Sequence, residues 1–269
     1  RQHQQGVCTA ATTMSVVGLS DTDGVCTLQP LGAFSATGST PSVAAGRVSY
    51  VFDLHGPALA VDTACSSSIT VLHVVSLSFG LHSAGVAGLP GVNAGTPGAP
   101  GERPTSRQQA IGGGVSLKLT VRPSIALASA GFLSSDGRCK TFDRRANGIV
   151  RGEAVSAFLL RRDVDEGFPS EAVRGPPGLL AATEVQQDGK SASLTAPNGQ
   201  AQRELVAACW EQTGAPVGAP RLIETHGTGT ALGDPTEISS LAGAMGRSLL
   251  THSALKANLG HAEPVSGHL

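Results

Sequence analysis

Apolar and polar positions along this chain alternate between short apolar runs and runs with a helical period. Residues 59–61 read as the end of a buried strand, and from Ile69 onward apolar residues recur at helical spacing. Similar patterns predict a helix over 200–213 and further strands over 110–119, 154–160, 222–225 and 253–256. Strands that alternate with helices, without hairpin signals, indicate a layered α/β fold.

Cys65 lies at the first of these strand-to-helix turns. A thiol near a helix N-terminus meets the helix dipole and free N–H groups, which favour thiolate over thiol. The hydroxyls of 66–68 can cap the first helical turn. Most cysteines are small buried packing residues, so this position alone leaves packing and nucleophilic roles open.

Two histidines stand at similar places. His226 follows the predicted strand 222–225 and opens a glycine-rich turn. His261 ends the segment LKANLGH (255–261), which we predict as another strand end that runs into a Gly-His turn. Two histidines beside glycine at strand ends, together with the similarly placed Cys65, favour a shared site over three packing roles.

Composition narrows the class of protein. Charged residues make up 14% of the 269 residues and the formal net charge is −1, without a basic stripe for nucleic acid or a long apolar segment for a membrane. The 5 cysteines are scattered and form no C-x-x-C pair, which favours free thiols over a disulfide framework or a zinc site. We therefore expect a cytoplasmic protein, with an organelle-targeting segment ahead of Arg1 as an open alternative.

At these motifs the chain resembles the β-ketoacyl synthases, the condensing enzymes of fatty-acid and polyketide assembly, and above all the ketosynthase domain of type I polyketide synthases. The matching segments, in order, are SVAAGRVSYVFDLHGPALAVDTACSSS (42–68), DGRCKTFDRRANGIVRGE (136–153), TAPNGQAQ (195–202), ETHGTGTALGDPTE (224–237) and LKANLGH (255–261). The resemblance implies a thiolase-like layered α-β-α-β-α fold. It also implies decarboxylative Claisen condensation of an acyl thioester with a malonyl-type carrier thioester, in polyketide or fatty-acid biosynthesis.

The resemblance also assigns the main roles. Cys65 would hold the acyl group, and His226 and His261 would donate hydrogen bonds to the enolate oxygen that forms on decarboxylation. Lys256 would organise the electrostatics near the second histidine and pair with Glu237. The alternative for Lys256 is a strand-end lysine whose stem covers apolar surface.

The remaining site residues have structural explanations as well. Asp234 is predicted as a helix N-cap, with Glu237 closing a capping box, so a supporting role in the site competes with a capping role. Thr228 and Thr230 would bind the pantetheine amides, as the resemblance implies, although hydroxyl side chains are also common in turns.

The resemblance implies partners rather than a resident cofactor. Substrates would arrive on the phosphopantetheine arm of an acyl carrier protein or carrier domain, so the domain itself would bind no cofactor and no metal. Neighbouring polyketide synthase domains would be further partners, and the complete protein would be a homodimer.

The match covers part of the family's domain. We expect 1–269 to be an incomplete β-ketoacyl synthase domain, the end of the N-terminal half joined to the start of the C-terminal half. Alone it should be inactive, because the resemblance places a second oxyanion donor in a glycine-rich loop beyond Leu269. The stretch 83–109, rich in glycine and proline, is expected to be a flexible insertion, with a retained non-coding stretch as the alternative.

Rival interpretations fit less well. A papain-like hydrolase pairs one histidine with an amide and has a different cysteine motif, and thiolases carry a second cysteine where this chain has histidine. Relatives that do not elongate have lost the cysteine or a histidine, whereas all three are present here. The alternative from another class is an inactive truncated remnant with only a scaffolding or carrier-docking role, which acyl loading would distinguish.

Overall fold

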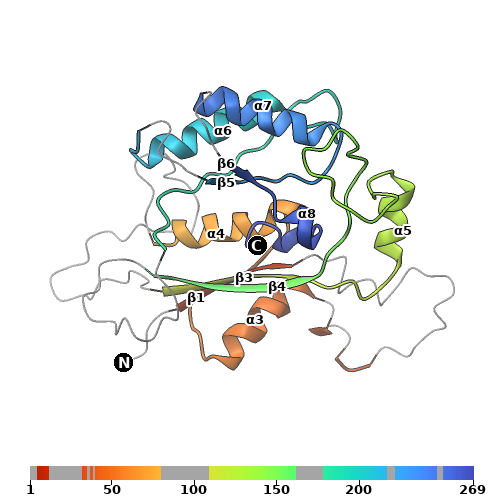
Figure 1. Cartoon of the computed structure of the whole chain (residues 1–269). Helices are drawn as coiled ribbons and strands as arrows, with labels where there is room; N and C mark the ends of the chain where they lie inside the picture. The colour runs from red at the N-terminus through yellow and green to blue at the C-terminus, as the bar shows by residue number, and fades with distance from the viewer. Residues whose placement is uncertain are drawn as a thin grey trace.

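The computed structural model describes residues 5–11 as backbone, together with 32–34, 37–38, 40–79, 109–161, 178–216, 222–246 and 251–269. Its elements are layered in the order helix, sheet, helix, sheet, helix (Figure 1). The predicted insertion 83–109 lies outside the described residues except for Gln109, the first residue of a strand.

In the part of the chain that the structure describes, the larger sheet has four strands, in the order β2-β1-β3-β4. β1 is parallel to both neighbours, whereas β3 and β4 are antiparallel. Among the described residues β2 lies at the edge of the sheet and Leu59 is 47% exposed, so the prediction that 59–61 ends a buried strand is wrong about burial. The four strands are β1 (Gln5–Ala11), β2 (Ala58–Val61), β3 (Gln109–Ser116) and β4 (Ala154–Arg161).

Helix α4 (Ser67–Leu77) covers one face of this sheet and α3 (Pro41–Val51) covers the other (Figure 1). Val71, Val75 and Phe79 project from the α4 region onto Ala110 of β3 and form the buried apolar cluster. Fully burying each of the large side chains contributes roughly 1.5–3 kcal/mol to folding.

The second sheet pairs β5 (Leu222–Glu224) with the parallel strand β6 (Thr251–Ser253). Two helices that contact each other, α6 (Gly199–Gln212) and α7 (Gly233–Met245), lie on its outer side (Figure 1). The side chain of Asn198 accepts hydrogen bonds from the first backbone N–H groups of α6, which explains where this helix begins.

Most predicted elements are confirmed: the helix after Cys65, the strands at 110–119, 154–160 and 222–225, and the helix at 200–213. The strand at 253–256 is wrong beyond Ser253, because Lys256 opens the short helix α8 (Lys256–Leu259). The sequence pattern did not predict β1, α3, α5 (Arg122–Ser129) or the 3-10 turns η2 (Ala64–Ser66) and η4 (Glu263–Val265). In the described part of the chain, no helix is long and apolar enough to cross a membrane.

Candidate active site

A tightly bonded turn between β2 and α4 presents Cys65. Asp62 Oδ1 accepts a hydrogen bond from the backbone N–H of Ala64 at 3.0 Å. The hydroxyl of Ser67 accepts from the N–H of Thr63 at 2.9 Å and donates to the carbonyl of Ala64 at 2.7 Å. These bonds hold Ala64 at φ 54°, a left-handed conformation that costs roughly 1–2 kcal/mol for a non-glycine residue. The turn therefore fixes where the sulfur projects.

His261 lies directly against this sulfur. Its Nε2 is 3.0 Å from Cys65 Sγ, and the histidine is 1% exposed whereas the cysteine is half-buried. The backbone N–H of His261 donates to Val150 at 2.7 Å, and its carbonyl accepts from Gly152 at 2.8 Å. Gly260, at φ 78°, lets the chain turn from α8 into this bridge. Since α8 precedes His261, the prediction of a strand end at this position is wrong.

His226 follows β5 and completes a group of three with Cys65 and His261. The centroids of the two imidazole rings lie 5.5 Å apart, with the ring planes at 87°. The carboxylate of Glu237 accepts from the backbone N–H groups of His226 at 2.5 Å and Gly227 at 2.9 Å. Residues that follow β5, follow α8 and precede α4 thus meet at one place, although 196 positions separate Cys65 from His261.

The acidic residues of α7 brace the glycine-rich turn rather than cap the helix. The N-cap position of α7 is Leu232, which makes no side-chain cap bond, so the predicted capping box is wrong. The carboxylate of Asp234 instead accepts from the N–H groups of Gly229 and Thr230, at 3.1 and 3.3 Å. Four backbone N–H groups of the turn thus bond to the carboxylates of Asp234 and Glu237, and bonds to an ionised acceptor are stronger than bonds to a neutral one.

The two threonines of this turn lie close together. Thr228 is buried, and its hydroxyl oxygen is 3.5 Å from that of Thr230. The hydroxyl of Thr230 also accepts from the N–H of Gly233 at 3.2 Å, which gives it a structural role at the start of α7. Pantetheine binding by these hydroxyls stays a prediction.

The loop 134–150 supports the turn from its other side. Thr141 Oγ1 donates to the carbonyl of Gly227 at 2.6 Å, and the N–H of Gly148 donates to the carbonyl of Gly229 at 3.0 Å. The N–H of Phe142 donates to the carboxylate of Asp234 at 2.8 Å. The long matching segment 136–153 is therefore a scaffold for the His226 turn.

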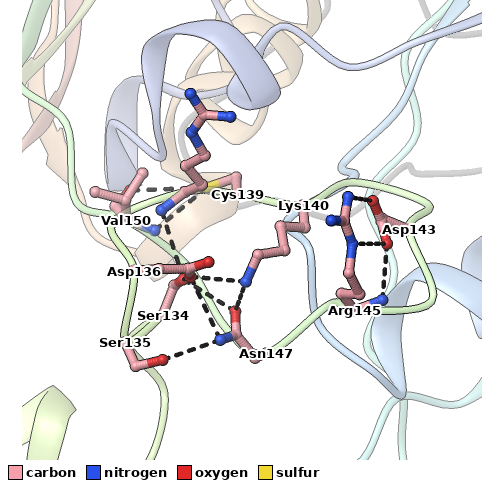
Figure 2. Close-up of polar contacts among 10 residues, drawn as sticks. Ser134, Ser135, Asp136, Cys139, Lys140, Asp143, Arg145, Asn147 and Val150 are labelled. Atoms are coloured by element: carbon pink, nitrogen blue, oxygen red, sulfur yellow. Dashed lines mark hydrogen bonds and ion pairs between the residues drawn. The ribbon is translucent and has the colours of Figure 1, made fainter.

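Figure 2 shows how this loop keeps its own shape. Lys140 Nζ reaches back to Asp136 at 2.6 Å and to Asn147 Oδ1 at 2.8 Å, which ties the two ends of the loop together. Cys139 is buried, and its sulfur accepts from the N–H of Val150 at 3.3 Å. Cys139 therefore has a packing and hydrogen-bonding place in the loop, unlike Cys65.

Lys256 is buried at the start of α8, with 7% of its surface exposed, so the alternative of a lysine extending to solvent is wrong. Burial lowers its pKa, while the negative charges of Glu224 and Glu237 act in the opposite direction. Its positive charge acts on both Cys65 and His226. Lys256 is therefore placed to influence the site electrostatically, and its pairing with Glu237 stays a prediction.

The protonation states follow from burial. Desolvation, followed by the negative charge of Glu263, raises the pKa of Cys65. A backbone hydrogen bond at the helix start acts in the expected direction and lowers the pKa, but burial outweighs it. Burial, then the neighbouring His226 and Lys256, lowers the pKa of His261 to about 3. Burial and Lys256 lower the pKa of His226 to about 4, although its surface exposure lets solvent moderate this shift. At neutral pH the site therefore holds a thiol and two neutral imidazoles.

A buried ionic cluster that the sequence analysis missed lies behind His261. The carboxylate of Glu263 accepts a forked pair of hydrogen bonds from Arg151, one at 3.1 Å, and contacts Lys118 Nζ at 3.2 Å. Burial would raise the pKa of Glu263, but these two cations outweigh it and lower the pKa below its ordinary value. Arg151 belongs to a matching segment, yet nothing in its spacing pointed to Glu263.

Ser266 was also missed. Its buried hydroxyl lies 2.7 Å from His261 Nδ1 and donates to the carbonyl of Glu263 at 2.8 Å. Its place five residues after His261, in a turn, is the signal that would have drawn attention to it. Among the described residues, no group of three or more His, Cys, Asp or Glu side chains is arranged to hold a metal ion.

Comparisons with known proteins agree with this geometry. The N-terminal domain model of β-ketoacyl synthase matches residues 2–99 and 103–166, and the C-terminal domain model matches 178–269. A phenolphthiocerol/phthiocerol polyketide synthase polypeptide of Mycobacterium tuberculosis is 36% identical over 244 residues, which cover 89% of this chain and 14% of that protein. A highly reducing polyketide synthase of Aspergillus niger is 34% identical over 245 residues, 89% of this chain and 9% of its own length.

Solved structures show the same fold. The ketosynthase from module 6 of the bacillaene synthase of Bacillus subtilis 168 superposes with a TM-score of 0.77 at 28% identity, covering 99% of this chain and 41% of that one. An oxazolomycin ketosynthase domain from Streptomyces albus gives a TM-score of 0.70 at 29% identity, covering 98% and 41%. The chain thus spans less than half of these ketosynthases, and the predicted thiolase-like layered fold is confirmed. By its two domain matches and its fold, this chain belongs to the β-ketoacyl synthase family.

Proposed function

We propose that this chain supplies the nucleophile and both histidines of a β-ketoacyl synthase that extends an acyl chain by decarboxylative condensation. One observation carries the proposal: Cys65 Sγ lies 3.0 Å from His261 Nε2, and the ring of His226 lies beside the ring of His261 and perpendicular to it. Sulfur suits this reaction, because a thiolate is a strong nucleophile near neutral pH and a thioester is a good acyl donor.

The first half-reaction would be acyl loading. The sulfur of Cys65 attacks the carrier thioester, a new S–C bond forms, and the old S–C bond breaks. The carrier arm leaves as a thiol and takes the proton that Cys65 gave up. The acyl group then remains on Cys65 as a thioester.

The second half-reaction would join the extender unit. Loss of CO2 from a malonyl-type thioester leaves an enolate, whose oxygen needs hydrogen-bond donors. Neutral imidazole N–H groups can fill that role, and each donor of this kind is worth roughly 3 kcal/mol in oxyanion sites. The enolate carbon attacks acyl-Cys65, a C–C bond forms, the S–C bond of acyl-Cys65 breaks, and the released thiolate takes a proton from water. The exposed surface of His226 fits a donor that meets an incoming substrate.

The partners follow from this chemistry. An acyl carrier protein or carrier domain would bring both substrates, with Thr228 and Thr230 as binding residues for its pantetheine arm and without a resident cofactor. The polyketide synthases that the chain resembles are many times longer, which supports neighbouring domains as partners in a cytoplasmic homodimer. Because the chain spans 41% of the solved ketosynthases, we also expect 1–269 alone to condense nothing.

Acyl loading in the complete polypeptide, meaning this chain joined to the remaining ketosynthase segments, tests the proposal. Intact mass should show one acyl group on the parent protein and none on Cys65→Ala. Cys65→Gln should still release CO2 from a malonyl thioester without condensation. The alternative of an inactive remnant predicts that the parent protein does not load, and loading of Cys65→Ala at the parent rate would remove Cys65 from the mechanism.

A further inference from the structure

Three contacts run in series from the sulfur of Cys65 to a backbone carbonyl. Cys65 Sγ lies 3.0 Å from His261 Nε2, and on the other side of the ring Nδ1 lies 2.7 Å from Ser266 Oγ. The same hydroxyl lies 2.8 Å from the carbonyl oxygen of Glu263. Both His261 and Ser266 are buried, so these groups depend on one another for their hydrogen bonds.

The protons of this series can be placed by elimination. A carbonyl oxygen only accepts, so the single hydroxyl proton of Ser266 points to Glu263. The hydroxyl oxygen must then accept at its contact with His261, which places the ring proton on Nδ1. A neutral imidazole has one N–H, so Nε2 presents a lone pair to Cys65. The opposite tautomer would turn the hydroxyl proton toward Nδ1 and set two oxygen lone pairs against each other at 2.8 Å.

We propose that Ser266 is a positioning residue that fixes the Nδ1–H tautomer of His261, so that Nε2 accepts the proton of the Cys65 thiol. The inference rests on the proposed function of Cys65 as the residue that carries the acyl group. Resemblance alone assigns His261 to the enolate oxygen. The hydrogen bonds around it give it an earlier task, in acyl loading.

The carbonyl at the end of the series is held firmly. Glu263 has a backbone φ of 49°, and Arg151 and Lys118 bind its carboxylate. Its carbonyl also accepts the backbone N–H of Ser266 at 3.1 Å. The buried ions thus fix the acceptor that orients the hydroxyl, and the hydroxyl orients the ring.

The step balances without another reactant. As Cys65 Sγ bonds to the acyl carbon of the carrier thioester, its proton moves to His261 Nε2. The imidazolium, which Nδ1–H···Oγ still orients, then gives this proton to the sulfur of the leaving arm. The arm departs as a thiol, and Nε2 again holds a lone pair. Several neighbours act on the pKa of the ring during this step. His226, Lys256 and Lys118 disfavour the imidazolium, whereas the carboxylate of Glu263 favours it.

This assignment separates the two histidines during decarboxylation. His226 keeps an N–H for the enolate oxygen, whereas His261 can donate from Nε2 only after its tautomer changes. That change requires the hydroxyl of Ser266 to turn from the Glu263 carbonyl to Nδ1. The direction in which the Ser266 hydroxyl points would therefore differ between acyl loading and condensation.

Alkylation of Cys65 by iodoacetamide, followed by peptide mass mapping of the complete polypeptide, tests the role of Ser266. In the parent protein the rate should change little between about pH 5.5 and 7.5, because neutral His261 assists the thiol throughout. In Ser266→Ala the ring no longer has a fixed tautomer, so part of its assistance is lost and free thiolate carries more of the reaction: the rate should rise with pH and fall about tenfold at pH 6. Ser266→Thr keeps the hydroxyl and should restore the flat profile.

Ser240→Ala is the matched control, because Ser240 is also a buried serine, and its hydroxyl shares one proton between two backbone carbonyls, at 2.9 and 2.7 Å. It should keep the parent profile. A flat profile in Ser266→Ala, or a steep one in the parent protein, overturns the proposal. Iodoacetamide needs no carrier and no condensation, so this result is independent of the acyl-loading test.

The tautomer can also be read directly in the parent protein, which covers the case in which Ser266→Ala does not fold. In a sample labelled with ¹⁵N in histidine, His261 should show its proton on Nδ1 and a bare Nε2 near neutral pH. A proton on Nε2 in the unloaded protein contradicts the assignment.

Discussion

His226 and His261 stand side by side with perpendicular rings, yet the chain holds them by opposite means. The turn of His226 is held through its backbone, because the Glu237 carboxylate accepts the N–H groups of His226 and Gly227. The ring of His261 is itself held, between Cys65 on Nε2 and Ser266 on Nδ1.

The difference teaches how one site can divide two proton tasks between identical side chains. A ring that is bonded at both nitrogens has one tautomer and a fixed direction of proton transfer. A ring on a braced but exposed turn keeps its N–H available for an incoming oxygen. The neighbours of each ring, rather than its residue type, therefore set the role of each histidine.

The largest effect should come from the buried ions behind His261. Arg151→Met leaves Glu263 with Lys118 alone, and breaking a buried pair in this way should lower the free energy of unfolding by about 3–5 kcal/mol, measured with a denaturant.

Arg145→Met is the matched control for this change. Solvent screens the pair of Arg145 with Asp143, so its loss should change the free energy of unfolding far less than the loss of Arg151. Equal losses in the two variants would mean that the ions behind His261 do not support the turn.

The free energy of unfolding should fall in acid, because His261 is buried as a neutral imidazole. The pKa of His261 falls from its ordinary value near 6.5 to about 3, so the unfolded chain binds more protons. Its contribution to stability is complete above pH 6.5 and declines as the pH falls toward 3, by up to about 1.4 kcal/mol per pH unit. Glu263, whose pKa is also lowered, adds to the loss only below its ordinary value of 4.5. His261→Gln should reduce the slope of the stability profile between pH 6.5 and 4.5 but not remove it, because the pKa values of His226 and His268 are lowered as well. An unchanged slope would contradict the buried neutral ring.

The carboxylate of Glu237 should matter for one histidine and not for the other. Glu237→Gln leaves one acceptor oxygen for two backbone N–H groups, at a cost of about 1–3 kcal/mol in stability. Malonyl decarboxylation should slow, whereas Cys65 alkylation should stay within about twofold of the parent rate. A large loss of alkylation would show that the two turns are not independent. Glu204→Gln, on the exposed face of α6, is the control.

The smallest effect concerns the turn that presents Cys65 to both histidines. Ala64→Gly removes the left-handed strain at φ 54° and should stabilise the fold by about 0.5–1 kcal/mol after the entropy of the unfolded glycine is counted. Ala45→Gly, inside helix α3, should instead destabilise by about 1 kcal/mol. If both variants lowered the free energy of unfolding, the turn at Ala64 would be unstrained.

Apolar periodicity predicted the elements that carry the buried apolar cluster, α4, β3 and β4, because those runs are long and regular. It failed at 253–256, where a four-residue run cannot distinguish a strand end from the first turn of α8. The prediction of a helix N-cap at Asp234 also failed, because the sequence does not show whether this carboxylate bonds to its own helix or to the turn at Gly229.

The three reactive side chains could be found from the sequence because each stands in a distinctive turn motif. Their protonation could not, because the pKa of Cys65 depends on burial and on Glu263, which is almost two hundred positions away. Arg151 lies in a matching segment, yet its partner Glu263 is 112 positions away, and the spacing of the residues does not reveal that contact. Ser266 is only five positions from His261, but a single serine in a turn does not show that its hydroxyl meets the ring.

The division of labour between the two histidines is tested most directly by comparing His226→Ala with His261→Ala in one assay. We predict that His261→Ala slows iodoacetamide alkylation of Cys65 at pH 6 by about 10²-fold, the lower end of the range for a lost general base. His226→Ala should leave that rate within about twofold of the parent rate while it slows malonyl decarboxylation. Equal effects of the two variants on alkylation would contradict the account, because each ring would then serve the sulfur alike.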